Sequence, residues 1–330
     1  MRVITLEEHF TLPFVAERVG AERIKRRGFP PADMNRNLHL GPLLADMGDK
    51  RVADLDEHGI SLQVMSSSGP GADLVEGEAG VSLAREMNDR LGESVTKHKG
   101  RLAGFAHLPM HSPEAAALEL ERCVKHLGFL GGLINGVTED LFLDDPRFDP
   151  ILAKAVELDT PIYVHPSLPP EPVNRIYYER LPGRTGAVLA SAGWGWHSET
   201  ALHILRMVVA GTLDRHPKLR LIIGHMGEGL PAALERCDDV LGPVTKHLTR
   251  GVSQTILDQV WITTAGFLHM TPFLAALTTF GADRILFSVD YPYTTNAKAK
   301  PFLDSLPVSP ADLHKIAHGN AERVLKLPTA

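Results

Sequence analysis

The sequence is poor in cysteine, has no long apolar run and carries no excess of positive charge. Its two cysteines, Cys123 and Cys237, cannot form a disulfide framework, so we expect reduced thiols in a cytoplasmic protein. No apolar run approaches the roughly 18 residues of a transmembrane helix. The start, MRVITLEEHF, has too short an apolar stretch for a signal peptide. We therefore expect neither a disulfide scaffold nor a membrane partner.

The charge balance excludes a further class of partner. A net charge of -6 and a pI near 6.2 give no electrostatic basis for binding nucleic acid or an anionic membrane. The composition of the 330 residues, 44% hydrophobic and 22% charged, is that of an ordinary globular protein with a large core. We expect residues 1–330 to form a single domain.

Short apolar runs recur along the chain and predict eight strands, at 2–9, 61–68, 101–109, 130–136, 161–166, 220–227, 259–266 and 284–292. Segments of helical periodicity lie between them, at 79–100, 112–128, 145–159, 198–217, 230–244 and 309–327. This alternation indicates the α/β class with parallel βαβ units, and eight strands in a chain of this length favour a single (β/α)8 TIM barrel. A doubly wound sheet is the alternative, but no G-x-G-x-x-G motif follows an early strand.

Two stretches interrupt this rhythm, after the first and the fifth predicted strand. Residues 11–46 are polar and contain Gly and Pro, whereas residues 166–197 carry aromatic residues such as Tyr177 and Trp194. In a barrel, such insertions lie over the mouth at the carboxyl ends of the strands, where active sites form. We interpret both as active-site loops. Disordered linkers between domains are the alternative, which the aromatic residues disfavour.

Polar side chains end several of the predicted strands, although apolar strands rarely end in unpaired His or Asp without a reason. The carboxyl ends of parallel strands meet at one rim of a barrel, so these side chains can converge. Carboxylate and imidazole together suit a divalent first-row metal ion. The residues are Glu7, Glu8 and His9 in the first strand, His165 in the fifth, His225 and Glu228 at the sixth, and Asp290 in the eighth.

Strand geometry distinguishes the two glutamates, because residues i and i+2 of a strand share a face. The outside of a barrel must be apolar to meet the helices, and Ile4 and Leu6 satisfy that requirement. Glu7 and His9 are then predicted to point inward as an E-x-H pair. Glu8 is left on the outer face near the rim, where it could cap a helix or pair with a basic residue.

The same alternation orients the later strand ends. His165 shares a face with Tyr163, and Asp290 shares one with Ser288 and Leu286. One histidine at a strand end is more often structural than a ligand, but the whole combination is far more specific. It predicts a mononuclear metal site, with open positions for water or substrate, made by Glu7, His9, His165 and Asp290.

These motifs resemble the amidohydrolase superfamily, in its metal-dependent aromatic decarboxylase branch. That branch includes gamma-resorcylate (2,6-dihydroxybenzoate), 2,3-dihydroxybenzoate and 5-carboxyvanillate decarboxylases. The E-x-H start is the most specific feature, because superfamily hydrolases typically carry H-x-H there. The similar stretches span nearly the whole chain: LEEHF (6–10), LDEHGI (55–60), LGFLGGLINGV (127–137), 143–166, 199–231 with IIGHMGEGLP, ADRILFSVDYPY (282–293) and NAERVLKL (320–327).

The resemblance implies the same four metal ligands and a hydrogen-bonded pair of His225 and Glu228 near the metal. Binuclear members of the superfamily carry a carboxylated lysine at the end of the fourth strand, where this sequence has Asn135. One divalent ion is therefore expected, either Zn or Mn. The resemblance also implies substrate contacts from Arg51, Asn135, Tyr293 and Arg236.

Several of these assignments have ordinary structural alternatives. In relatives the arginine matching Arg236 can reach in from a neighbouring subunit, which implies a homodimer or a homotetramer. Arg236 could equally be a solvated helix residue, and Arg51 could form a surface salt bridge. His197, in GWGWHSET, could contact substrate, although we favour a role in capping the following helix.

The function implied by the resemblance is nonoxidative decarboxylation of a hydroxylated benzoate, a small aromatic carboxylate. Asp290 would donate a proton to the ring carbon that bears the carboxylate, and His225, oriented by Glu228, would assist. The alternative is a metal-dependent hydrolase of the same superfamily, acting on a lactone, amide or carbon–carbon bond, with Asp290 as the base. A non-catalytic binding protein on a barrel scaffold is disfavoured by so many polar strand-end groups.

Overall fold

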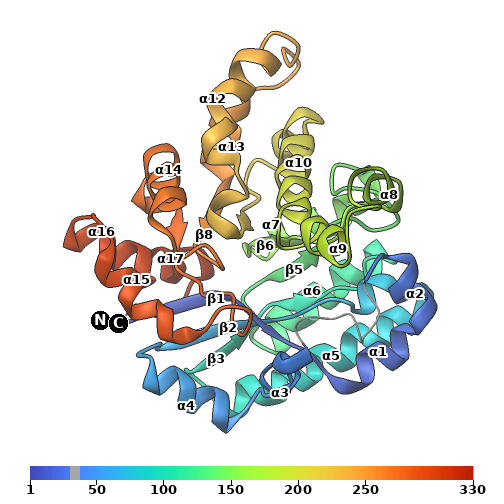
Figure 1. Ribbon diagram of the computed structural model, residues 1–330, viewed down its shortest axis with the longest axis vertical. Helices are drawn as coiled ribbons and strands as arrows, with labels where there is room; N and C mark the ends of the chain where they lie inside the picture. The colour runs from blue at the N-terminus through green and yellow to red at the C-terminus, as the bar shows by residue number, and fades with distance from the viewer. Residues whose placement is uncertain (30–37, 330) are drawn as a thin grey trace.

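The computed structural model describes residues 1–29 and 38–329, and short parallel strands lie at its centre (Figure 1). Successive strands pair in chain order within two sheets, β1 to β3 and β4 to β9. The strands are β1 (Ile4–Phe10), β2 (Leu62–Ser67), β3 (Leu102–Gly104), β4 (Ala106–His107), β5 (Gly132–Asn135), β6 (Ile162–His165), β7 (Leu221–Ile223), β8 (Val260–Thr263) and β9 (Ile285–Leu286). Because β3 and β4 are separated only by Phe105 and fall in one predicted run, the strands occupy the eight predicted positions.

The two sheets meet at two seams. At the first, the Phe105 N–H donates to the Met65 carbonyl, while the next residue donates to Gly131, so one run bridges both sheets. At the second, the segment after β9 runs beside β1, where the His9 N–H donates to the carbonyl of Tyr291 at 2.7 Å. The Ser288 hydroxyl there accepts the N–H groups of Leu6 and Glu7, at 2.9 and 3.1 Å. These contacts bring the last strand position against the first, and the predicted TIM barrel is confirmed.

Helices surround the strands on the outside (Figure 1). All six predicted helical segments contain helices of the structure. Two of those segments are divided into shorter helices, near residues 210 and 315. The α-helices are α1 (Pro13–Val19), α2 (Ala21–Arg26), α3 (Gly41–Ala45), α4 (Asp49–Glu57), α5 (Gly77–Lys97), α6 (Pro113–His126), α7 (Asp149–Glu157), α8 (Glu171–Tyr177), α9 (Thr185–Ala190), α10 (Gly195–Val209), α11 (Thr212–Arg215), α12 (Leu230–Leu241), α13 (Val252–Gln259), α14 (Met270–Phe280), α15 (Ala299–Ser305), α16 (Pro310–His314) and α17 (Asn320–Leu325). Short helical turns are η2 (Leu38–Leu40), η3 (Ala72–Leu74), η4 (Pro146–Phe148), η5 (His225–Gly227), η6 (Ala282–Arg284), η7 (Asn296–Lys298) and the π-helix η8 (Lys315–Gly319). None of the described helices is long and apolar enough to cross a membrane.

Two apolar layers form the core, one inside the barrel and one between the strands and the helices. The inner layer contains Leu133, Tyr163 and Leu286, and it also contains Ile4 and Leu6. The prediction that Ile4 and Leu6 face outward is therefore wrong. The pairing of β1 with β2 shifts its register between Thr5 and Glu8. Such a bulge re-aims side chains, so that Leu6 and Glu7 both reach the barrel interior.

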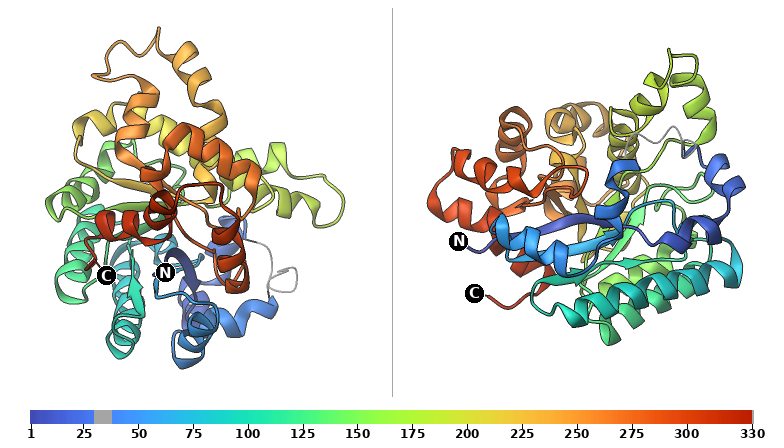
Figure 2. Two further views of the ribbon diagram at one scale, coloured as in Figure 1. Left: turned by 90° about the vertical axis from the view of Figure 1, so that its left-hand side faces the viewer. Right: turned by 60° about the horizontal axis from the view of Figure 1, so that its bottom comes forward.

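The two insertions are folded and contact each other (Figures 1 and 2). The first contributes α1, α2 and α3, and the second contributes α8 and α9. The guanidinium of Arg27 donates to the Ser167 hydroxyl at 2.9 Å and to the Pro169 carbonyl at 3.3 Å. Phe29 packs against Leu168 and Tyr178 in a small separate cluster. Residues 30–37 of the predicted loop 11–46 lie outside the described residues; elsewhere the insertions are packed structure rather than linkers.

Candidate metal centre and active site

Three predicted ligands converge at the carboxyl ends of β1 and β6. Ligand atoms of Glu7, His9 and His165 lie within 4.8 Å of one another. Glu7 Oε1 lies 3.3 Å from His165 Nε2. Both Glu7 Oε1 and His9 Nε2 are buried without a hydrogen-bond partner among the described residues. Buried polar atoms are almost always satisfied, so these atoms fit a divalent metal ion that takes carboxylate and imidazole ligands.

The second oxygen of Glu7 is held by residues from across the barrel, on β6 and β8. The Tyr163 hydroxyl donates to Glu7 Oε2, and the Thr263 hydroxyl lies 3.4 Å from the same atom. Gly224 makes room for the carboxylate, because a Cβ there would come within 2.3 Å of Glu7 Oε2. Burial alone raises the pKa of Glu7, but the facing imidazoles outweigh it and hold that pKa below its ordinary value. Glu7 therefore offers Oε1, as an ionised oxygen, to the centre of the site.

Asp290 reaches the cluster from the segment after β9, with its backbone at φ 72°. Its carboxylate oxygens lie 3.3 Å from His9 Nε2 and 3.9 Å from His225 Nε2. Glu8 holds this segment by accepting the N–H groups of Val289 and Tyr291, at 2.9 and 2.8 Å. Burial raises the pKa of Glu8 to about 8. The expectation that Glu8 caps a helix or pairs with a base is thus wrong: it fastens the backbone on both sides of Asp290.

His225 and Glu228 form a buried pair beside this cluster. His225 Nδ1 lies 2.8 Å from Glu228 Oε1, and His225 Nε2 points to Glu7 Oε1 at 3.6 Å. Burial lowers the pKa of His225, but the charges of Glu228 and Glu7 outweigh it and raise the pKa well above its usual value. The turn that carries the pair has positive φ at three non-glycine residues, His225, Met226 and Glu228. Such backbone outliers cluster at functional sites.

His197 contacts the same carboxylate. It lies in the first turn of α10, and its Nδ1 is 2.6 Å from Glu228 Oε2. Its side chain makes no cap to the helix, so the favoured prediction for His197 is wrong. The sequence offered no signal for this contact, because residues 197 and 228 are brought together only by the packing of α10 against the η5 turn.

Two of the four predicted substrate contacts lie at the mouth. Asn135 pairs in register with His165, and its Nδ2 is buried without a partner among the described residues. Tyr293 is 39% exposed, its ring lies 5.5 Å from that of His9, and its hydroxyl is 2.7 Å from Ser68 Oγ. Desolvation raises the pKa of Tyr293 to about 12. Asn135 thus has an unused amide donor beside His165, and the ring of Tyr293 lies against His9.

The two predicted arginine contacts lie elsewhere. Arg51 is fully buried behind β1, where it donates to the carbonyls of Asp46, Leu43 and His9 at 2.7 to 3.0 Å and to Gln63 Oε1 at 3.1 Å. This corrects both expectations for Arg51, since its guanidinium is neither at the surface nor open to a substrate. Arg236 is exposed on α12, the helix that begins two residues after Glu228.

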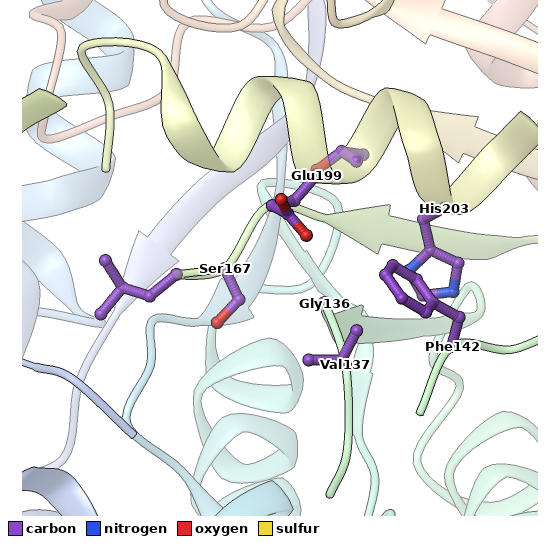
Figure 3. A pocket seen from close by; sticks show the side chains of 8 residues that line it. Gly136, Val137, Phe142, Ser167, Glu199 and His203 are labelled. Atoms are coloured by element: carbon purple, nitrogen blue, oxygen red, sulfur yellow. The ribbon is translucent and has the colours of Figure 1, made fainter. Parts of the chain in front are cut away.

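A small pocket lies next to the site, between α10 and the loops after β5 and β6 (Figure 3). It is lined by Gly136, Ser167, Glu199 and His203 among others, and its volume is about 10 Å³. Such a volume holds no more than one water molecule. His203 Nε2 accepts the Leu143 N–H there at 2.8 Å. The pocket is thus part of the packing behind β5 and β6 and does not admit an aromatic acid.

Two histidines and two carboxylates meet at the strand ends of a parallel barrel, and some of their buried polar atoms have no hydrogen-bond partner among the described residues. This combination defines a metal-dependent enzyme of the (β/α)8 class. The chain belongs to the amidohydrolase family, whose model matches residues 45–327.

Within this family, the chain is similar over nearly its whole length to decarboxylases of aromatic acids. It is 35% identical to the gamma-resorcylate decarboxylase of Rhodococcus jostii (strain RHA1), over 98% of both chains. A crystal structure of 2,6-dihydroxybenzoate decarboxylase complexed with 2,6-dihydroxybenzoate matches with a TM-score of 0.87 and 34% identity, over 99% of this chain and 100% of that one. The dihydroxybenzoic acid decarboxylase from Polaromonas sp. JS666, solved with bound manganese and the inhibitor 2-nitroresorcinol, matches with a TM-score of 0.87 and 36% identity, over 99% and 98%. The predicted resemblance to the aromatic decarboxylase branch is confirmed.

Proposed function

We propose that this protein is a metal-dependent, nonoxidative decarboxylase of a hydroxylated benzoate. The observation that carries the proposal is the ligand set of Glu7, His9 and His165 with Asp290 beside it, in a chain similar over its whole length to dihydroxybenzoate decarboxylases. The position for a bridging lysine is occupied by Asn135. One divalent ion, Mn or Zn, is therefore the cofactor we infer, and manganese is the ion bound in the Polaromonas relative.

The chemistry requires a proton at a carbon atom. Loss of CO2 directly from an aryl carboxylate leaves an electron pair in an unstabilised sp2 orbital. Protonation of the ring carbon that bears the carboxylate lets the electrons of the breaking C–C bond return to the ring as CO2 departs, so that one proton is consumed for each CO2 released. Glu7, His9 and His165 would hold a divalent ion, which would supply Lewis-acid chemistry at the carboxylate and phenol oxygens of the substrate.

The residues of this chain have distinct parts in that reaction. Asp290 is the proton donor in our proposal, because its carboxyl lies at the metal cluster and next to His225 Nε2. His225, held by Glu228, supports proton movement at Asp290. Asn135 and Tyr293 present hydrogen-bond donors for the carboxylate or hydroxyl oxygens of the substrate. The backbone clamp by Glu8 keeps the segment that carries Asp290 at the mouth.

The direct test is turnover of 2,6- and 2,3-dihydroxybenzoate by protein loaded with Mn or Zn, measured by CO2 release and by the fall in absorbance of the hydroxybenzoate. Metal analysis should give one ion per chain. An absence of turnover on a hydroxybenzoate panel, together with hydrolysis of a lactone, would replace the proposal with the hydrolase alternative.

Asp290→Asn tests the proton donor within this proposal. We expect kcat to fall by about 100-fold or more, since general acid catalysis contributes ~10²–10⁴, while substrate still binds. Asp304→Asn is the matched control, because Asp304 is exposed and pairs only with Lys300 among the described residues. Full activity in the Asp290 variant would contradict the assignment.

We further infer the organisation of the protein from its surface and core. A single barrel domain over residues 1–330 is supported by one apolar cluster that extends from Val3 to Ala317.

A homodimer or homotetramer is supported by exposed apolar side chains on neighbouring helices, among them Leu202, Val240 and Leu274, and by the exposed Arg236. Light scattering after gel filtration measures the assembly. A cytoplasmic location is in keeping with the two unpaired cysteines.

A further inference from the structure

We propose that His197 is a positioning residue, which holds the second oxygen of Glu228 and so aims His225 at the reacting groups. This inference rests on the proposed decarboxylase function. It extends the pair of His225 and Glu228 to a row of three side chains, His197–Glu228–His225, that runs from α10 to the metal cluster.

Distances and burial define the row. The carboxylate of Glu228 accepts from His197 Nδ1 at 2.6 Å and from His225 Nδ1 at 2.8 Å, one imidazole on each oxygen. The three residues are 4 to 8% exposed. The rings of His197 and His225 meet edge to face at 4.6 Å between centroids, and Phe267 packs edge-on against both, at 5.2 and 5.7 Å. Little space is left for any of these side chains to rotate.

The second donor is needed because of where Glu228 lies. Without His197, Glu228 Oε2 would be a buried, ionised oxygen with no partner among the described residues, and such an atom is costly to leave unsatisfied. The carboxylate could then turn to seek another donor and would carry the ring of His225 with it. Because His225 Nε2 lies 3.6 Å from Glu7 Oε1 and 3.9 Å from Asp290 Oδ2, a rotated ring would lose both neighbours.

The remaining contacts of His197 fix its own orientation. The Trp196 indole N–H lies 3.3 Å from His197 Nε2, and the Ala192 carbonyl lies 3.2 Å from the same atom. With Nδ1 on Glu228 and Nε2 beside these two groups, both ring nitrogens of His197 are engaged. His197 therefore acts through Glu228 and does not reach the mouth, which separates it from the substrate contact considered from the sequence.

The hydrogen bond is tested by two variants of equal size, His197→Asn and His197→Leu. The amide of asparagine can donate from near the position of Nδ1, whereas leucine cannot. We expect His197→Leu to lose about 10-fold in kcat, the size typical of partners that orient a metal-site group, with KM and the metal content unchanged. His197→Asn should recover most of that loss. His126→Leu, at an exposed histidine in the last turn of α6, is the control.

Three outcomes would overturn the proposal: an unchanged kcat in His197→Leu, equal losses in both variants, or a rise in KM at constant kcat. Binding of a second metal equivalent that is lost in both variants would also overturn it, because the three side chains would then be ligands. If the leucine variant does not fold, His197→Phe, which keeps the ring packing without a donor, replaces it.

A readout independent of turnover separates this proposal from the proposed function. With 15N-labelled histidine, the Nδ1–H groups of His197 and His225 should each give a downfield proton signal in the wild type, typical of an N–H bonded to a carboxylate. In His197→Leu the signal of His197 should be missing and that of His225 should remain. The His197 signal can be present in a protein that fails to decarboxylate any hydroxybenzoate, in which case the function is wrong and the hydrogen bond stands. Its absence in the wild type refutes the positioning role alone.

Discussion

Replacement of Tyr163 by Phe tests how the barrel prepares Glu7 for a metal ion. Tyr163 is fully buried, its ring packs at 5.9 Å from that of Phe105, and its hydroxyl donates to Glu7 Oε2. Phenylalanine keeps the ring and removes only the oxygen. Glu7 Oε2 would then retain only the Thr263 hydroxyl at 3.4 Å among the described residues. The variant therefore removes the bond of that hydroxyl to the carboxylate, together with its 3.0 Å contact to Thr263 Oγ1, and leaves the ring in place.

The magnitude follows from the charge and burial of that bond. A hydrogen bond to a charged group contributes about 1.5–3 kcal/mol to stability, so the free energy of unfolding of the metal-free protein should fall by about that amount in urea. Metal affinity should fall by about 10- to 100-fold, as for other partners that orient a ligand, because Glu7 Oε1 is no longer held toward the imidazoles. Competition with a chromogenic chelator measures the affinity.

The control is Tyr177→Phe, since Tyr177 is 67% exposed on α8. It should alter neither the stability nor the metal affinity by a measurable amount. If Tyr163→Phe binds Mn and Zn as tightly as the wild type does, the reasoning that Tyr163 presents Glu7 to the metal is refuted, whatever the change in stability.

Two further predictions concern residues away from the reacting atoms. Burial lowers the pKa of His203 to about 3. Because the unfolded imidazole takes up a proton below about pH 6.5, the folded protein should lose about 2 kcal/mol of stability from this group between pH 6.5 and 5. His203→Gln, which can still accept the Leu143 N–H, should lose less stability between these two pH values, as measured by urea titrations. An equal loss of stability in the variant and the wild type would contradict the assignment. Arg51→Met should lower stability by roughly 3 kcal/mol without a specific rise in KM, whereas a higher KM at unchanged stability would restore Arg51 as a substrate contact.

The sequence predicted the fold because periodicity depends on local composition. Eight apolar runs mark the strands, and each contains a strand of the structure. The alternation argument also selected Glu7 and His9, yet for a reason that the structure does not support. It required Ile4 and Leu6 to face outward, whereas both lie in the inner layer. A bulge between Thr5 and Glu8 changes the face of the sheet to which consecutive side chains point. The local sequence pattern does not predict this bulge.

Long-range contacts account for what the sequence could not predict. Arg51 was expected to be a substrate contact or a surface salt bridge, because three of its four acceptors are backbone carbonyls, which carry no sequence signal. Tyr163 was assigned to the right face without a role, since its partner Glu7 is 156 residues away. His197 meets Glu228 only through the packing of α10. In each case the sequence gives the type of the residue but not the residue that it contacts in the fold.

The two adjacent glutamates show how closure of the barrel and assembly of the site depend on the same contacts. Glu7 turns inward and offers an oxygen to the metal cluster, while Glu8 accepts two backbone N–H groups on either side of Asp290. At the same seam, Ser288 accepts the N–H groups of Leu6 and Glu7. A short last strand, β9, leaves few backbone bonds to close the ring, so side chains at the seam complete it. Because those side chains flank both Glu7 and Asp290, loosening the seam would separate the metal ligand from the proton donor, and the barrel can hold this site only when it is closed.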